Sequence, residues 1–320
     1  MAELKIDNLK TYFFTSTGTV RAVDGVSFSL DGKSIGIAGE SGSGKTTLGL
    51  SILNLIPPPG RIVSGSILLD GKDIVQLDQE KYRTEVRWKQ ISMVFQGAMN
   101  ALNPVYTIGR QLMEPLKFHS GLVGEEAKKL AEDALSDVGL DASIMQRYPH
   151  ELSGGMKQRA VIAMALILKP KIVIADEPTT ALDVIVQAQV INLLKQLKKD
   201  LGISIMIITH DLSVISEIAD LVGIMYAGEL VEIGSAEDIY NNPKHPYTQR
   251  LLNAVPRIRG KATKLESIPG SPPDLKNPPS GCRFHPRCPY VMNVCKVSSP
   301  SYFTFGSDHK ATCWLYKEKV

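Results

Sequence analysis

A glycine-rich segment that ends in lysine and threonine is the first feature of the sequence that could do chemistry. It runs Gly39-Glu-Ser-Gly-Ser-Gly-Lys45-Thr46 and fits the phosphate-loop pattern GxxxxGK followed by Ser or Thr. Its glycines would let backbone amides converge on phosphate oxygens, and a following helix N-terminus would add partial positive charge. Lys45 would reach the β- and γ-phosphates, and the Thr46 hydroxyl would bind Mg²⁺. The segment predicts a nucleoside triphosphate site with Mg²⁺; the alternative is a Gly/Ser turn with an incidental lysine.

An acidic pair, Asp176-Glu177, follows an apolar run at 171–175. Ligands of open α/β sheets bind at the carboxyl ends of the strands, so this position suits a metal-binding Asp176. Glu177 would position or polarise the attacking water. An isolated Asp-Glu pair is more often a solvated turn, but the apolar strand and the phosphate loop favour the functional interpretation.

The elements that must hold these residues alternate between apolar strands and helices. The run at 34–38 precedes the phosphate loop, and helix-forming residues follow it until Pro57-Pro58-Pro59. The stretch after Asp183 has apolar residues at spacings of three and four, which is typical of one helical face. Uninterrupted apolar strands that alternate with helices indicate a parallel sheet covered on both faces. The fold class is therefore predicted to be α/β, with strands expected at 34–38, 171–175 and 203–208 and an antiparallel N-terminal layer at 3–9, 20–30 and 65–70.

Composition and charge exclude several classes of function. The chain has 320 residues, with 36 Lys and Arg against 33 Asp and Glu. A net charge of +3 is too small to predict nucleic-acid binding by charge. No apolar run is long enough for a bilayer span, and the N-terminus lacks the apolar stretch of a secretory signal. We therefore expect a cytoplasmic protein.

The remaining parts of the chain predict a helical insert and a C-terminal extension. Between 103 and 149 the pattern is helical, with one apolar side on a charged segment. From 269 to 281 five of thirteen residues are proline, which favours an extended linker. All four cysteines follow this linker, at Cys282, Cys288, Cys295 and Cys313.

Further motifs resemble those of the ABC ATPases. Leu152-Ser-Gly-Gly-Met-Lys-Gln-Arg159 resembles the family's signature, and it lies between the two nucleotide motifs, as in that family. Gln96 resembles the Q-loop, Ala181-Leu-Asp183 the D-loop, and Thr209-His-Asp211 the switch-histidine segment. The resemblance covers about residues 3–240. It implies a P-loop NTPase core at 1–240 with an antiparallel β layer and a helical subdomain at about 97–158, followed by a C-terminal metal-cluster extension at 241–320.

The resemblance also implies the arrangement of the site. Two such domains would associate head to tail, so that each ATP lies between the phosphate loop of one and the signature of the other. Gln96 would join metal and water to the helical subdomain, and His210 would reach the γ-phosphate. Among the aromatics at 12–14, Phe13 is the favoured adenine-stacking residue, although such aromatics also commonly pack into a sheet face. The expected catalytic residues are Glu177, His210 and Gln96, with Thr46 and Gln96 on Mg²⁺; the expected nucleotide-binding residues are Phe13, Gly39, Ser41, Gly42, Ser43, Gly44, Lys45, Thr46, Thr47, Ser153, Gly154, Gly155, Asp176 and Asp183.

Met156 stands where glutamine is usual in the signature, and this is typical of the subfamily that energises uptake of oligopeptides, dipeptides and sometimes nickel. The segments 100–104, 148–156 and 245–252 are also similar to that subfamily. The resemblance implies a peripheral subunit on the cytoplasmic face of the membrane. Its expected partners are a second, related ATPase chain, two transmembrane permease subunits and, indirectly, an extracytoplasmic solute-binding protein; no nucleic acid is expected.

The cysteine spacing leaves more than one metal open. Gaps of five, six and seventeen residues are wider than the pairs usual in structural zinc sites and do not match ferredoxins. Disulfides are disfavoured in a cytosolic protein. The resemblance favours a [4Fe–4S] cluster on Cys282, Cys288, Cys295 and Cys313, because the dipeptide type carries one. Zinc, with His285 or His309 as further ligands, is the lesser alternative.

Two other functions compete with a transport ATPase. A soluble ABC ATPase of DNA repair or translation would use the cysteine segment to bind nucleic acid, but such proteins usually have paired cassettes or long coiled coils. A phosphate-loop kinase would explain Lys45 and Thr46 and leave the signature segment without a role.

Overall fold

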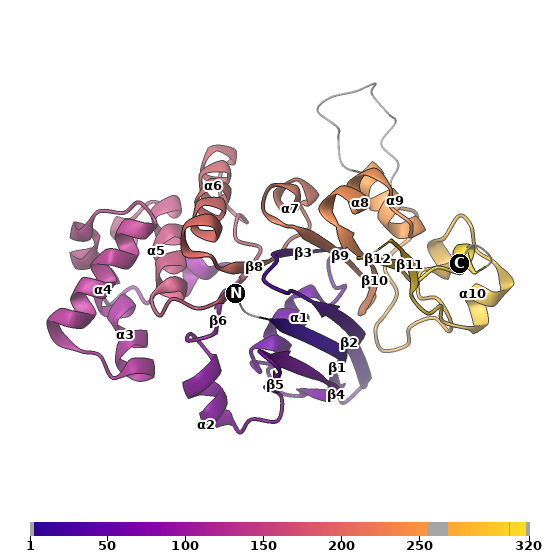
Figure 1. Ribbon diagram of the computed structural model, residues 1–320, viewed down its shortest axis with the longest axis horizontal. Helices are drawn as coiled ribbons and strands as arrows, with labels where there is room; N and C mark the ends of the chain where they lie inside the picture. Colours follow the sequence, from indigo (N-terminus) through magenta and orange to yellow (C-terminus); the bar gives the residue numbers. More distant parts are fainter. Residues whose placement is uncertain (1–2, 255–267, 307, 318–320) are drawn as a thin grey trace. The chain divides into compact units, whose positions relative to one another are not determined.

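The computed structural model describes residues 3–254, 268–306 and 308–317. The chain forms two compact units (Figure 1). The helical unit comprises Leu30–Ser34, Leu68–Ile208 and the N-terminus to Leu4. The phosphate-loop unit comprises Lys5–Ser29, Ile35–Ile67 and the chain from Thr209 onward. Each unit is described by itself.

Three parallel strands form the centre of the helical unit. Residue Val94 of β6 (Ile91–Val94) pairs with Ala175 of β7 (Ile172–Asp176). Asp176 in turn pairs with Ile208 of β8 (Ser204–Ile208). All residues of the three strands are buried, as expected when helices cover both faces of a parallel sheet. The predicted parallel arrangement of the strands near 171–175 and 203–208 is confirmed.

Helices make up most of the remaining helical unit. α3 (Ile108–Ser120) and α4 (Gly124–Asp137) are amphipathic, and they pack on each other and on α5 (Gly154–Leu166). Ala127, Ala131 and Leu135 form the buried stripe of α4, at the spacing that places side chains on one helical face. The other helices and the short strand of this unit are α2 (Gln79–Lys81), α6 (Val184–Leu201) and β5 (Lys72–Asp73).

An antiparallel layer in the order β2–β1–β4 occupies the N-terminal part of the phosphate-loop unit. It consists of β1 (Leu4–Thr15), β2 (Gly18–Ser29) and β4 (Gly60–Leu69). Gly65 is required at its place in β4, because it has φ +94° and a Cβ there would lie 2.5 Å from the carbonyl oxygen of Asn8. The antiparallel layer predicted from alternation is therefore present, with strands longer than expected.

A second sheet in the same unit begins with the strand that leads into the phosphate loop. β3 (Ile35–Ala38) runs parallel to β9 (Leu221–Tyr226), which pairs antiparallel with β10 (Glu229–Ser235). The sheet continues through β12 (His309–Ala311) to β11 (Phe303–Phe305), as Figure 1 shows at the yellow end of the chain. The helices of the unit are α1 (Lys45–Ile52), α7 (Leu212–Ile218), α8 (Ala236–Asn241), α9 (Pro246–Asn253) and α10 (Asn293–Val297).

The cysteine segment packs into this unit. Phe284 is 1% exposed and contacts the rings of Tyr226 on β9 and Tyr247 on α9. Leu275, in the proline-rich stretch, accepts a backbone hydrogen bond from Arg21 on β2 at 3.0 Å. The segment expected as an extension at 241–320 thus supplies strands and core residues to the phosphate-loop unit; its residues 255–267, 307 and 318–320 lie outside the described part of the chain.

In the described ranges, no helix combines the length and the apolar character that crossing a bilayer requires.

Candidate functional site

The phosphate loop connects β3 to α1 and depends on glycines with left-handed backbone. Gly39 has φ +150° and a Cβ there would meet the carbonyl oxygen of Met225 at 2.1 Å. Gly44 has φ +100° and a Cβ there would meet the carbonyl oxygen of Ala22 at 2.0 Å. Because other side chains rarely adopt these angles and would clash, the two fixed glycines of the motif are explained by the structure.

Lys45 is folded back over this loop. Its Nζ donates to the carbonyl oxygens of Gly39 at 2.8 Å and of Glu40 at 2.9 Å. Gly44 is the N-cap of α1 and brings no side chain to the first-turn amides. The loop therefore presents backbone donors, a helix N-terminus and a lysine together, which is the arrangement that binds a triphosphate. Of the predicted loop residues, Ser41, Gly42 and Thr46 are exposed, Thr47 is half-buried and Ser43 is buried.

His210 is positioned by its neighbours at the end of β3. Thr209 is buried, and its amide donates to the carbonyl oxygen of Ile37 at 3.2 Å. Asp211 is the N-cap of α7 and accepts from the amide of Ser213 at 2.8 Å. His210 is exposed between these two fixed residues. The structure therefore brings His210 to the strand end from which the phosphate loop departs.

In the helical unit, the predicted acidic pair and Gln96 lie at the carboxyl ends of adjacent strands. Asp176 is the last residue of β7 and is 1% exposed. Gln96 follows β6 by two residues and is exposed. Because Val94 pairs with Ala175, these side chains share one edge of the parallel strands. A buried carboxylate beside an exposed amide suits a site for Mg²⁺ and water.

Glu177 is held in an unusual backbone conformation. Its φ is +47°, in the left-handed region that carries strain for a residue with a side chain. Its amide donates to the carbonyl oxygen of Ile208 at 2.8 Å, and its Oε2 accepts from the hydroxyl of Thr180 at 3.1 Å. These two bonds fix the direction of the carboxylate, which a residue that positions water requires.

The signature residues begin α5. Ser153 is the N-cap, and its Oγ accepts from the amide of Met156 at 3.3 Å. Ser153 and Gly154 are exposed, whereas a Cβ on Gly155 would lie 2.8 Å from Cγ1 of Val186. Glycine there lets α5 approach the start of α6. The N-terminus of α5 thus offers exposed backbone donors of the kind that bind an anion.

Asp183 has a structural role in the described part of the chain. Its Oδ1 accepts from the amide of Val186 at 2.9 Å and caps α6. Val186 therefore lies between the two motifs: its amide donates to Asp183, and its side chain lies against Gly155. A nucleotide contact of Asp183 stays a prediction.

The three aromatic candidates for adenine stacking have different surroundings. Tyr12 donates its hydroxyl to Oδ1 of Asp24 at 2.7 Å. The Phe13 ring lies against Gly60, where a Cβ would meet it at 2.6 Å. Phe14 is 40% exposed and has the guanidinium of Arg61 at 4.5 Å from its ring centre. The contact of Phe13 with Gly60 is the packing expected of a sheet residue, and its stacking on adenine stays a prediction.

The four cysteines lie in one neighbourhood. The pKa of the Cys282 thiol is raised to about 12, mainly by burial, and the other three cysteines act in the same direction. Burial likewise raises the pKa of Cys313 to about 11, with contributions from Cys288 and Cys295. The amides two residues later act in the opposite direction and lower the pKa of three of the thiols: Phe284 for Cys282, Tyr290 for Cys288 and Leu315 for Cys313. The four thiols therefore lie close enough to affect one another's ionisation, which a shared metal group also requires.

The fit is incomplete in one respect. Within residues 3–254, 268–306 and 308–317, no three His, Cys, Asp or Glu side chains form a group that could hold a metal ion. The [4Fe–4S] cluster and its zinc alternative therefore both stay predictions.

Sequence reasoning missed the residues that connect the cysteine segment to the phosphate loop. Arg287 forms an ion pair with Glu40, at 2.6 Å between Nη1 and Oε2. Tyr247 accepts a hydrogen bond from the Glu40 amide at 2.8 Å. These residues lie more than 200 positions from Glu40, and no local spacing signals a contact at that separation.

The predicted site residues thus fall into two groups. The phosphate-loop unit holds the triphosphate-binding loop, His210 and Phe13. The helical unit holds Asp176, Glu177 and Gln96 at one strand edge and the signature and Asp183 at the α5–α6 contact. The first group can bind a polyanion, and the second can bind a divalent cation and direct a water molecule.

Family models match two parts of the chain. The model described as "ABC transporter" matches residues 23–180. The model described as "Oligopeptide/dipeptide transporter, C-terminal region" matches residues 231–295.

Curated relatives are similar over almost the whole chain. The oligopeptide transport ATP-binding protein AppD of Bacillus subtilis is 47% identical, over 99% of this chain and 97% of the relative. The dipeptide transport ATP-binding protein DppD of Escherichia coli is 42% identical, over 98% of this chain and 96% of the relative. Among solved structures, a dimeric bacterial ABC transporter cassette is 30% identical with a TM-score of 0.64, covering 73% of this chain and 98% of that one.

Proposed function

Because this chain belongs to the oligopeptide and dipeptide branch of the ABC transporter family, we propose that it hydrolyses ATP to energise import of peptides through separate membrane subunits. The observation that carries the proposal is the phosphate loop, in which Lys45 lies over glycines that tolerate no side chain. It occurs in a chain that aligns from end to end with transport ATP-binding proteins. The interpretations as a DNA-repair or translation ATPase and as a kinase find no support in these relatives.

We propose that two ATPase domains enclose the nucleotide. Ser153, Gly154 and Gly155 would bind the γ-phosphate held by the phosphate loop of a second ATPase chain. The exposure of Ser153 and Gly154 at the N-terminus of α5 supports this role, because a helix N-terminus favours an anion. A related structure is a dimer, and a second, different subunit is the favoured partner. ATP binding would close the pair and hydrolysis would open it.

The residues have distinct roles in hydrolysis. The amides of the loop and Lys45 hold the β- and γ-phosphates, and Phe13 stacks on adenine. Thr46, Asp176 and Gln96 would hold Mg²⁺, which neutralises charge on the phosphates when it is bound. Glu177 takes a proton from the attacking water, and His210 orients that water and the γ-phosphate.

The cysteine module, defined here as residues 281–316, is proposed to bind a metal group through Cys282, Cys288, Cys295 and Cys313. A [4Fe–4S] cluster is favoured over zinc. The support is that the four thiols lie close enough to raise one another's pKa. A module with short strands and several prolines has little core of its own, so the metal group would stabilise it.

The partners follow from the same family membership. We propose two transmembrane permease subunits, which would place this chain peripherally on the cytoplasmic face of the membrane, and an extracytoplasmic solute-binding protein that selects the peptide. Nickel is a further candidate solute.

The test is uptake by the assembled transporter. Membrane vesicles that contain this chain with the permease and ATPase subunits encoded beside it should accumulate labelled di- or oligopeptide only with ATP and the binding protein. The matched control carries Lys45→Ala in this chain. Failure of this chain to copurify with any permease subunit would contradict the proposal, and uptake that is unchanged by Lys45→Ala would remove the motor role.

A further inference from the structure

Glu40, the second residue of the phosphate loop, is held at three groups: its carbonyl oxygen, its amide and its carboxylate. Its carbonyl oxygen accepts from Nζ of Lys45 at 2.9 Å. Its amide donates to the hydroxyl of Tyr247 at 2.8 Å. Its carboxylate receives two guanidinium bonds from Arg287, at 2.6 Å and 3.0 Å. The two contacts that come from outside the loop both belong to the C-terminal part of the chain.

Arg287 is itself fixed by the cysteine module. It directly precedes Cys288, it is 7% exposed, and its Nε donates to the carbonyl oxygen of Pro269 at 2.8 Å. Its amide donates to the carbonyl oxygen of Phe284 at 3.0 Å, which closes a turn between Cys282 and Cys288. The position of the guanidinium is therefore set by the turn between these two cysteines.

An aromatic cluster joins the same turn to the residues around Glu40. The Phe284 ring lies 5.2 Å from the ring of Tyr226 and 5.4 Å from that of Tyr247. The hydroxyl of Tyr226 accepts from Arg287 at 3.3 Å. The packing of Phe284 thus holds both outside contacts of Glu40 in place.

The charge of Glu40 makes this pairing consequential. A carboxylate beside a loop that must receive a triphosphate repels the ligand, and a low-dielectric setting strengthens the repulsion. A bidentate arginine neutralises the carboxylate and also fixes its direction. Loss of the arginine would leave the negative charge next to the phosphates.

We propose that Arg287 is a positioning residue for nucleotide binding: it neutralises Glu40 and fixes the position of this residue in the phosphate loop, so that the cysteine module controls the affinity for nucleotide. This inference rests on the proposed ATPase function. According to this inference the cysteine module contributes to ATP binding, whether or not it also binds a metal.

The test is the equilibrium affinity of the full-length chain for MgADP, measured by calorimetry so that hydrolysis plays no part. Arg287→Gln should raise Kd about tenfold, a coupling typical of contacting residues. Arg287→Lys keeps the charge but loses the bidentate geometry, so its Kd should lie between those of wild type and Arg287→Gln. An unchanged Kd for Arg287→Gln would overturn the proposal.

A double-mutant cycle shows whether the effect passes through Glu40. In a Glu40→Gln background the repelling charge is gone, so Arg287→Gln should change Kd less than about twofold. If Arg287→Gln still raises Kd about tenfold in the Glu40→Gln background, Arg287 does not act through Glu40 and the proposal fails.

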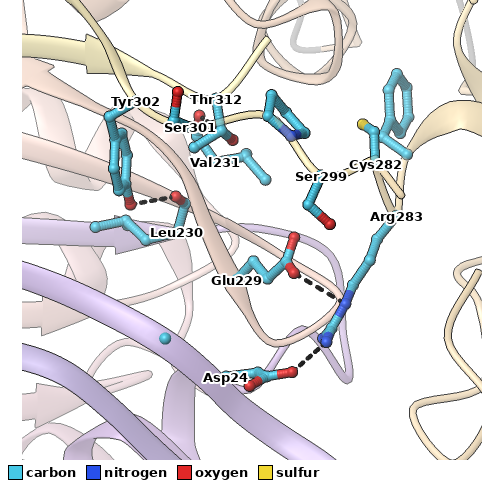
Figure 2. A pocket seen from close by; sticks show the side chains of 13 residues that line it. Asp24, Glu229, Leu230, Val231, Cys282, Arg283, Ser299, Ser301, Tyr302 and Thr312 are labelled. Carbon is cyan, nitrogen blue, oxygen red and sulfur yellow. Dashed lines mark hydrogen bonds and ion pairs between the residues drawn. The ribbon is translucent and has the colours of Figure 1, made fainter. Parts of the chain in front are cut away.

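Arg283 provides the matched control in the same turn. Figure 2 shows its guanidinium directed to Asp24 and Glu229 beside a small pocket, and it is as buried as Arg287. In the described part of the chain the polar partners of Arg283 are Ala227, Asp24 and Glu229, none of which belongs to the phosphate loop. Arg283→Gln should therefore lower the melting temperature and leave Kd within about threefold. Equal losses of affinity from both substitutions would show that Arg287 only helps to hold the cysteine module in place, and this would overturn the proposal.

The same measurements separate this inference from the proposed function. A wild-type chain that binds no nucleotide, or that binds it equally after Lys45→Ala, contradicts the ATPase function. A wild-type chain that binds MgADP with Lys45-dependent affinity, but is insensitive to Arg287→Gln, contradicts only the role of Arg287.

Discussion

Nε2 of His309 lies 2.7 Å from Oε1 of Glu232, and both side chains are almost completely enclosed. The same carboxylate accepts from the amides of Lys244 at 2.6 Å and His245 at 2.8 Å. Glu232 therefore joins β10 to the residues before α9 and to β12 of the cysteine module. A buried carboxylate with this many donors is stabilising only while all of its partners remain.

The neighbouring His245 predicts a specific dependence of stability on pH. Burial lowers its pKa to about 4, although Glu232 acts in the opposite direction. The unfolded chain takes up a proton near pH 6.5 and the folded chain does not, so stability is complete above pH 6.5 and falls as the pH drops toward 4. The loss amounts to at most about 3 kcal/mol. It is measured from melting temperatures between pH 7 and pH 4.5.

His245→Asn is the control, because asparagine can also accept from the Tyr247 amide that His245 caps. The gap in melting temperature between wild type and variant should narrow as the pH falls. Glu229, whose pKa burial raises to about 7, titrates in both proteins and cancels in the comparison. A gap that stays constant over this range would show that His245 binds its proton equally well in the folded and unfolded chain, which would contradict the lowered pKa.

Glu177→Gln should separate binding from turnover. The amide keeps the shape of the side chain and its backbone position at φ +47°, but it cannot take a proton from water. Phosphate release should fall about 100- to 10,000-fold, while the Kd for ATP stays within about twofold. Rapid ATP hydrolysis by the Glu177→Gln variant would contradict the role given to Glu177. The His210→Ala variant should also hydrolyse ATP slowly.

A pair of glycines in the cysteine module tests its packing. Gly281 (φ +67°) and Gly306 (φ +80°) share the left-handed backbone, but a Cβ on Gly281 would lie 2.4 Å from the carbonyl oxygen of Cys295 and a Cβ on Gly306 would meet nothing within 4 Å. Alanine costs about 1 kcal/mol of strain at either place. Gly281→Ala should cost about 2 kcal/mol more, because it also disturbs the bond from the Cys282 amide to the same oxygen. Equal unfolding midpoints in urea for the two variants would contradict the packing described.

The metal prediction has a direct chemical readout. The full-length chain purified without oxygen should be brown and contain iron and sulfide in comparable amounts, and Cys295→Ser should lose most of both. Thr304→Ala is the control, because Thr304 is exposed on β11 and lies nine positions from the nearest cysteine in the sequence. A colourless protein with one zinc ion would reverse the assignment.

The parallel strands and the phosphate loop could be predicted because their signals are local. The run before Gly39 is apolar throughout, and Lys45 and Thr46 follow the glycines at a spacing that few other structures need. The helix after Asp183 could be predicted from apolar residues at spacings of three and four, and α6 begins at the next residue.

The role of the C-terminal part could not be predicted in the same way. β12 is three residues long, too short for alternation to mark it, and its partner β10 lies about eighty positions earlier. Phe284 and Arg287 stand among prolines and cysteines, where composition favours an irregular segment. Only the folded chain shows that one packs between two tyrosines and the other reaches Glu40.

The pairing of β12 with β10 at Glu232 and Ala311 has a consequence for biosynthesis. During translation the phosphate loop and β10 are synthesised before β12. One edge of β10 therefore stays unpaired until the residues of β12 have emerged from the ribosome. Exposed strand edges of this kind invite mispairing during translation. Messages truncated after α9 would therefore yield chains prone to aggregation, and cells would need holdase chaperones for this stage of synthesis.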